Sequence, residues 1–231
     1  MLPLFVACGG TNPEPERSNR AAAAPPITPE VKAAAATATS NAPRIIFLGD
    51  SLTAGLGLDI KDNFPSRIEQ RLEEKGLEFD VVNAGVSGDT SAGGLRRLEW
   101  AMADGNPRIL VIALGGNDGL RGLPPEQLEA NLAAIIEQAR ARGLAVILAG
   151  MEAPPNFGAD YTTRFRQVYP RLAARYDIPL IPFLLEGVAG DAAFNQPDGI
   201  HPNQRGAQVV ADLVWRTLEP ALDQARASTP R

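Results

Sequence analysis

Four large apolar residues run directly into a glycine, a carboxylate and a serine in the segment Ile45-Ile46-Phe47-Leu48-Gly49-Asp50-Ser51-Leu52-Thr53. The apolar run is too short and too uniform for a surface helix, so it predicts a strand buried on both faces of a parallel sheet. Active sites of open α/β sheets form at the carboxyl ends of strands, which places Ser51 on that rim. A serine after a strand is also a common helix N-cap, so this segment alone leaves both roles open.

Outward from this segment, short apolar runs alternate with amphipathic stretches along the chain. The alternation predicts β-α units around one parallel sheet, an α/β fold. Apolar residues recur at helical spacing in the longest amphipathic stretch, so one of its faces is expected to meet the sheet. The expected strands are 44–48, 79–83, 109–114, 145–149 and 179–182, and the expected helices are 64–75, 92–103, 125–142, 162–176 and 204–218.

The 231 residues fit one soluble domain with low-complexity ends, since 45% are apolar and 21% charged. We expect the domain to span residues 44–220, with a flexible Ala/Pro-rich linker at 9–43 and a frayed tail at 221–231. The net charge of −5 comes without long basic runs, which argues against nucleic acid as a partner. We expect a monomer.

Cys8 is the one cysteine, and it follows a short apolar run at the N-terminus. Residues 1–8 resemble the end of a bacterial lipoprotein signal, although a basic leader is missing and the apolar run is short. One interpretation is that Cys8 is lipidated, with translation starting upstream of Met1, and tethers a periplasmic or cell-envelope protein to the membrane. The alternative is an incidental cysteine in an apolar N-terminus.

The chain has a single histidine, His201, in a loop directly before the last expected helix. A serine hydroxyl needs a base to take its proton, and histidine suits that role near neutral pH. Asp198 lies three residues earlier, so a turn through Gly199 would bring its carboxylate to the histidine ring. The alternative is that Asp198 caps a turn and His201 is a solvated loop residue.

Two glycine-bearing segments follow other expected strands and offer hydrogen-bond donors. The lack of a side chain at Gly88 lets its backbone N–H approach a substrate oxygen, and the Asn117 side-chain amide is a second donor. Taken separately, each segment also reads as an ordinary β-α turn. Together with Ser51 and His201, they supply the parts that acyl transfer requires.

These residues resemble, in order, the four sequence blocks of the GDSL or SGNH hydrolases, over about residues 44–220. The resemblance is closest to the bacterial periplasmic thioesterases, arylesterases and lysophospholipases, and four ordered blocks are more specific than any one alone. The matching residues are Gly49-Asp50-Ser51-Leu52, Gly88, Gly115-Gly116-Asn117-Asp118 and Asp198-Gly199-Ile200-His201.

The resemblance implies a three-layer α/β/α fold with a five-stranded parallel sheet of flavodoxin-like topology. It implies that Ser51 is the nucleophile, His201 the base and Asp198 its partner. The N–H groups of Ser51 and Gly88 and the Asn117 amide would form the oxyanion hole. The implied substrate is a small-molecule acyl ester or thioester, with no metal and no cofactor.

The segment 151–161 corresponds to the loop that contacts the acyl chain in similar enzymes. Phe157 and Tyr161 offer it apolar surface, whereas the alternative is an ordinary connection that these aromatics close. The expected substrate-binding residues are Asp50, Pro155, Asn156, Phe157 and Tyr161.

Three rival functions remain at this point. A carbohydrate acetylesterase would use the same scaffold and the same Ser51. A nucleotide or flavin binder would need a phosphate loop, which the sequence lacks, and Asp50 would repel phosphate. A non-catalytic cell-envelope module would carry a vestigial site.

Overall fold

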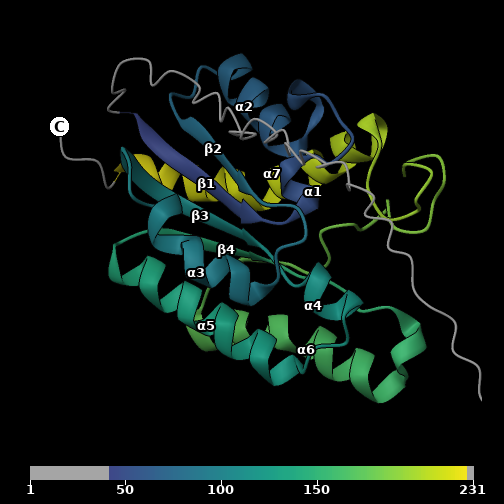
Figure 1. The fold of residues 1–231 in the computed structure, drawn as a ribbon. Helices are drawn as coiled ribbons and strands as arrows, with labels where there is room; N and C mark the ends of the chain where they lie inside the picture. Colours follow the sequence, from purple (N-terminus) through teal and green to yellow (C-terminus); the bar gives the residue numbers. More distant parts are fainter. Residues whose placement is uncertain (1–41, 228–231) are drawn as a thin grey trace, which may run out of the picture. The chain divides into compact units, whose positions relative to one another are not determined.

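The computed structural model describes residues 42–227 (Figure 1). The expectations for Cys8, for residues 1–41 of the signal and linker, and for residues 228–231 lie outside this range.

Within the described residues, five parallel strands form one sheet in the order β2-β1-β3-β4-β5. This is the flavodoxin-like order, so the predicted fold class is confirmed. The three central strands are buried because their apolar runs meet helices on both faces, as Ile45 and Ile109 show with no exposed surface. The strands are β1 Pro43–Gly49, β2 Asp80–Gly85, β3 Asn106–Ala113, β4 Ala145–Ala149 and β5 Leu180–Ile181.

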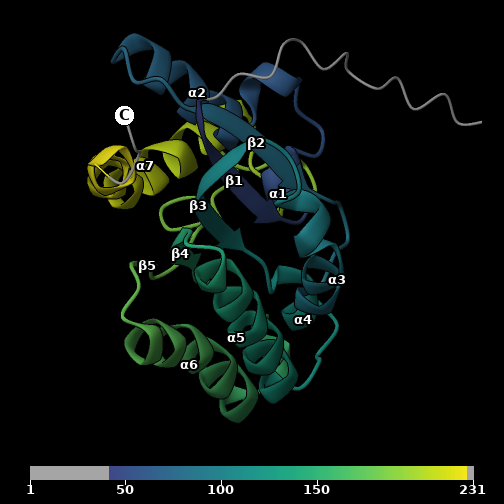
Figure 2. The same ribbon diagram turned by 90° about the vertical axis from the view of Figure 1, so that its left-hand side faces the viewer.

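Five longer helices cover the two faces of the sheet (Figures 1 and 2). Helices α2 (Phe64–Glu74) and α7 (Gln204–Ala227) pack together on one face. Helices α3 (Ser91–Ala101), α5 (Pro125–Ala141) and α6 (Ala159–Tyr176) pack side by side on the other. Helices on both faces make the three expected layers. None of the helices within residues 42–227 is long and apolar enough to cross a membrane.

Four short helical segments lie in the connections between strands and longer helices. They are only three to five residues long, too short to show a hydrophobic period in the sequence. Two of them, α1 and α4, begin within three residues of the ends of β1 and β3, at the edge where the site forms. The four segments are α1 Ser51–Ala54, η1 Ile60–Asp62, α4 Gly116–Leu120 and η2 Pro155–Phe157.

The end of α7 corrects an expectation. The helix was predicted to stop at Leu218 and the chain beyond residue 220 to fray, but α7 continues to Ala227. Pro220 breaks the helical hydrogen-bond pattern, which is why the sequence suggested an end there. The apolar spacing nevertheless continues through Ala221 and Leu222, which are 7% and 1% exposed. Their packing on the core keeps this part of the chain helical.

Candidate active site

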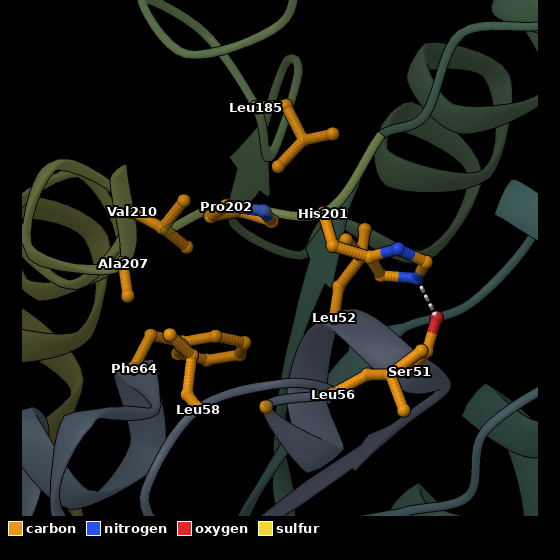
Figure 3. Close-up of a pocket in the computed structure, with 11 residues that line it drawn as sticks. Ser51, Leu52, Leu56, Leu58, Phe64, Leu185, His201, Pro202, Ala207 and Val210 are labelled. Atoms are coloured by element: carbon orange, nitrogen blue, oxygen red, sulfur yellow. Dashed lines mark hydrogen bonds between the residues drawn. The ribbon is translucent and has the colours of Figure 1, made fainter. Parts of the chain in front are cut away.

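The fold brings Ser51, His201 and Asp198 into one hydrogen-bonded row, although 150 positions separate the serine from the histidine. The Ser51 hydroxyl oxygen lies 2.8 Å from His201 Nε2 (Figure 3). On the other side of the ring, Nδ1 lies 2.7 Å from Asp198 Oδ2. With a proton on Nδ1, the ring donates to Asp198 and Nε2 accepts from the serine hydroxyl. This arrangement can activate a hydroxyl as a nucleophile.

The loop before α7 holds the histidine through the two oxygens of Asp198. Oδ1 accepts from the backbone N–H groups of Ile200 and His201 at 2.9 and 3.0 Å, and Oδ2 faces the ring. Gly199 lies between Asp198 and Ile200 in the chain and has φ +70°, a backbone conformation that favours glycine. The backbone N–H groups of His201 and Ile200, and then the His201 side chain, lower the pKa of Asp198 to about 2. Asp198 therefore caps the turn and faces the histidine at once, so the two interpretations of this residue are not exclusive.

Ser51 starts helix α1 but does not cap it. The N-cap is Asp50, whose Oδ1 accepts from the Leu52 N–H at 3.0 Å. The carboxylate takes the role that the sequence also allowed for the serine. The Ser51 hydroxyl is therefore left to pair with His201.

Asp50 is a buried carboxyl group beside the row, with 2% of its surface exposed. Burial raises its pKa to about 6, against the opposing effects of the Leu52 N–H, the charge on His201 and the Asn117 amide. Asn117 Nδ2 donates to the Asp89 carbonyl at 2.9 Å and to Asp50 Oδ2 at 3.3 Å. The bond to Asp50 is the longer of the two. A substrate oxygen that approaches Asn117 can therefore replace it at small cost.

Gly88 lines the groove with φ +82°, and a Cβ there would meet only Arg121 Nη2, at 3.9 Å. Its carbonyl accepts from Arg121 Nη2 at 2.8 Å, which fixes the peptide. The structure thus gathers Ser51, Gly88 and Asn117, the three expected oxyanion-hole residues, along one groove.

Two polar residues that the sequence analysis did not single out hold these loops in place. Arg97 of α3 donates to the carbonyls of Gly49 and Ala84, each at 2.7 Å, and to Asp89 Oδ2 at 2.6 Å. Asp118 is 1% exposed and accepts from the backbone N–H and the hydroxyl of Ser91 at 2.8 and 2.6 Å. Asp118 lies beside Asn117 in the block 115–118 that resembles the family, whereas no pattern in the sequence marks Arg97.

The groove beside Ser51 has a volume of about 560 Å³, and most of its lining is apolar. Loops after all five strands contribute to it, as expected for the carboxyl edge of a parallel sheet. A second, narrow cavity of about 10 Å³ continues past Ser51 and His201 toward α2 and α7, with room for about one water (Figure 3).

The segment after β4 contributes to the groove at its near end only. Asp50 and Pro155 line the groove, whereas Asn156, Phe157 and Tyr161 are not among its lining residues. The Phe157 and Tyr161 rings are in tilted contact, with their centroids 5.2 Å apart, and the Tyr161 hydroxyl donates to the Leu123 carbonyl at 2.8 Å. These aromatics pack against the connection between α4 and α5, which is the structural role that the sequence left open for them.

Within residues 42–227, no group of three or more His, Cys, Asp or Glu side chains gathers as a metal site would require. The geometry of the site is that of a hydroxyl, an imidazole and a carboxylate beside an apolar groove.

The model of the GDSL-like Lipase/Acylhydrolase family matches residues 47–209. Esterase TesA of Pseudomonas aeruginosa is 45% identical over 80% of this chain and 92% of the relative. Thioesterase 1/protease 1/lysophospholipase L1 of Escherichia coli K12 is 37% identical over 78% of this chain and 85% of the relative.

Among solved structures, the crystal structure of AlinE4, an SGNH-hydrolase family esterase, is similar with a TM-score of 0.66 and 40% identity. The match covers 80% of this chain and 99% of that chain. The similarity therefore extends over nearly the whole domain of that esterase, the carboxyl edge of the sheet included.

Proposed function

Because the chain belongs to the GDSL-like lipase/acylhydrolase family, we propose that it hydrolyses carboxylic esters and acyl thioesters through an acyl-enzyme on Ser51. It is an enzyme that acts on ester bonds, as its relatives named esterase and thioesterase indicate. The observation that carries the role of Ser51 is its 2.8 Å contact with His201, whose ring is held by Asp198. That contact supplies the base without which a serine hydroxyl is a poor nucleophile.

In the first step, Ser51 Oγ attacks the carbonyl carbon while His201 Nε2 takes the hydroxyl proton. The carbonyl oxygen becomes an oxyanion beside the N–H groups of Ser51 and Gly88 and the Asn117 amide. Asn117 exchanges its 3.3 Å bond to Asp50 for this oxygen. The bond to the alcohol or thiol then breaks, and the departing atom takes the proton from His201.

In the second step, water replaces the alcohol or thiol. His201 takes a proton from water, the resulting hydroxide adds to the acyl carbon, and Ser51 Oγ leaves with the proton. Asp198 keeps its negative charge throughout, because its pKa of about 2 lies far below neutral pH. It therefore stabilises the imidazolium in both steps.

Replacement of the nucleophile tests the proposal. We expect Ser51→Ala to lower kcat/KM for p-nitrophenyl butyrate by roughly four to six orders of magnitude. Circular dichroism should show that the variant stays folded. The matched control is Ser87→Ala, which removes the hydroxyl of another serine that lines the groove. Full activity in Ser51→Ala would refute the assignment.

The groove favours acyl chains over sugars as the group to be bound. Its lining is mostly apolar, whereas sugar hydroxyls need polar partners along their length. This supports an acyl ester or thioester over the carbohydrate acetylesterase alternative. Pro155 and Asp50 contribute to this lining, and Phe157 and Tyr161 support the Pro155 segment from behind.

We further propose that the enzyme works in the periplasm or cell envelope, tethered through a lipid on Cys8. The support is the sequence around Cys8 alone. The mass of the natively expressed protein tests it, since an unmodified Cys8 would remove the tether.

A further inference from the structure

The groove has two walls that differ in their relation to His201. One, here called the histidine wall, consists of Leu56, Leu185 and Ile200. Ile200 directly precedes His201, and Leu56 and Leu185 also line the narrow cavity together with His201 (Figure 3).

The other apolar set in the lining, here called the opposite wall, consists of Leu120, Ala153 and Pro155. These residues follow β3 and β4, and none of them lines the narrow cavity beside His201. Because the two substituents of a carbonyl carbon point in different directions, one of them can lie along each wall.

The proton transfer from His201 determines along which wall the leaving group lies and along which the acyl chain lies. When the ester bond breaks, its electron pair goes to the departing oxygen or sulfur, and His201 Nε2 delivers to it the proton taken from Ser51. The departing atom must therefore lie within hydrogen-bond reach of Nε2. The oxyanion lies toward Asn117 and Gly88, so the acyl chain takes the remaining direction, along the opposite wall.

We propose that the histidine wall is the binding subsite for the leaving group and that it selects apolar aryl and alkyl alcohols or thiols. The inference rests on the proposed function, because it assumes that His201 protonates the departing atom. Ile200 and Leu56 are 46% and 47% exposed in the free protein, so each has apolar surface to bury against such a group.

The charge of the groove supports this choice of ligand. Besides His201, the charged residues in its lining are Asp50 and Glu152, and no lysine or arginine occurs among the lining residues described. Glu152 pairs with Arg166 at 3.1 Å, so the acidic group in this lining that a phosphorylated leaving group would meet without a paired cation is Asp50. Apolar leaving groups avoid that cost and bury the surfaces of Leu56, Leu185 and Ile200.

Esters that share one acyl group test the subsite. All butyrates form the same acyl-enzyme, so differences in kcat/KM between them report the leaving group. We expect Ile200→Ser to lower kcat/KM for 1-naphthyl butyrate by about three- to tenfold. For methyl butyrate, whose leaving group is too small to reach the wall, we expect less than about a twofold change.

The matched control is Leu120→Ser, because Leu120 is 49% exposed and lies on the opposite wall. It should change the preference for acyl-chain length and leave the ratio of naphthyl to methyl ester unchanged. An equal loss on both esters in Ile200→Ser, or the naphthyl-specific loss in Leu120→Ser instead, would overturn the inference.

The charge selection has its own test. For the wild-type enzyme, we expect the competitive inhibition constant of 1-naphthol to be about tenfold or more lower than that of 1-naphthyl phosphate. Equal inhibition by the two would refute the preference for uncharged leaving groups.

A fluorophosphonate separates failure of this inference from failure of the proposed function, because its leaving group is a fluoride ion. Rapid labelling of Ser51 in both wild type and Ile200→Ser, without a change in ester selectivity, would overturn the subsite alone. Absence of labelling at Ser51 in wild type would overturn the proposed function and, with it, the subsite.

Discussion

Among single residues, Asp50 combines burial with a place beside the reacting groups. A carboxylate that loses its hydration is favoured in its neutral form, which raises the pKa from 3.8 to about 6. Since the folded-state pKa lies above that of the unfolded chain, Asp50 destabilises the fold as pH rises from about 3.8 to about 6. Above about pH 6 the loss of folding free energy caused by the buried charge is constant, on the order of 3 kcal/mol. This destabilising carboxylate is the N-cap of α1, the helix that begins at Ser51.

We therefore predict that Asp50→Asn increases the free energy of unfolding at pH 8, by about 1–3 kcal/mol. Asparagine can still accept from the Leu52 N–H, and it carries no charge to bury. At pH 4.5 the gain should fall to about a third of its value at pH 8, because the wild-type carboxyl is then protonated in the folded protein but still largely ionised in the unfolded chain. Urea denaturation at the two pH values measures this.

The exposed Asp59 provides the control for this measurement. Asp59→Asn removes one carboxylate without changing a buried group, so its stability should show no comparable dependence on pH. A gain from Asp50→Asn that is the same at pH 4.5 and pH 8 would contradict the electrostatic explanation.

At the scale of elements, helix α3 connects the strand ends that carry the site. Its Arg97 bonds to Gly49 at the end of β1, to Ala84 near the end of β2, and to Asp89, whose carbonyl holds the Asn117 amide. One guanidinium thus fixes the spacing between the Ser51 and Gly88 loops and, through Asp89, reaches Asn117. The planar guanidinium group has five N–H donors, so it can bind these two carbonyls and the Asp89 carboxylate at the same time although they lie in different directions.

We predict that Arg97→Met lowers the free energy of unfolding by about 2–4 kcal/mol, because two carbonyls and a carboxylate lose a charged donor. Methionine keeps the apolar stem, so packing is largely preserved. In the variant that remains folded, kcat should fall more than KM rises, since the oxyanion donors lose their spacing.

The adjacent Arg96→Met is the control, because Arg96 is exposed on the same helix. Chemical denaturation and steady-state kinetics of the two variants measure the effect. Equal stability and equal kcat in both would contradict a positioning role for Arg97.

Elements with a clear hydrophobic period were predictable from the sequence. All five expected strands and all five expected helices occur near their predicted positions. The helices α1 and α4 were not predicted, because a segment of four or five residues is too short to show a hydrophobic period. The end of α7 was predicted too early, because Pro220 suggested a helix end although Leu222 beyond it is buried. Tertiary packing decides such ends.

At the scale of the whole molecule, the topology explains why the site residues could be found but their supports could not. Ser51, Asn117 and His201 follow strands or precede a helix at one edge, so motif and topology together point to them. Arg97 and Asp118 act on backbone groups that come near only after folding. Asp118 lies in the block 115–118 that resembles the family, but no local pattern shows which groups either side chain contacts after folding.

The sheet therefore brings Ser51 from its first β-α unit and His201 from the loop before its last helix into one site, which we propose carries out acyl transfer. Among the described residues, the groove is built from loops at the carboxyl edge, which leaves the buried strands as scaffold. Specificity can then change in the loops while the triad stays fixed.

The most direct measurement is the position of the acyl group in enzyme quenched with acid during turnover of p-nitrophenyl butyrate. Digestion and tandem mass spectrometry should find a butyryl group on Ser51 and none in Ser51→Ala. Ester consumption with an unmodified Ser51, or with the butyryl group on another residue, would contradict the account.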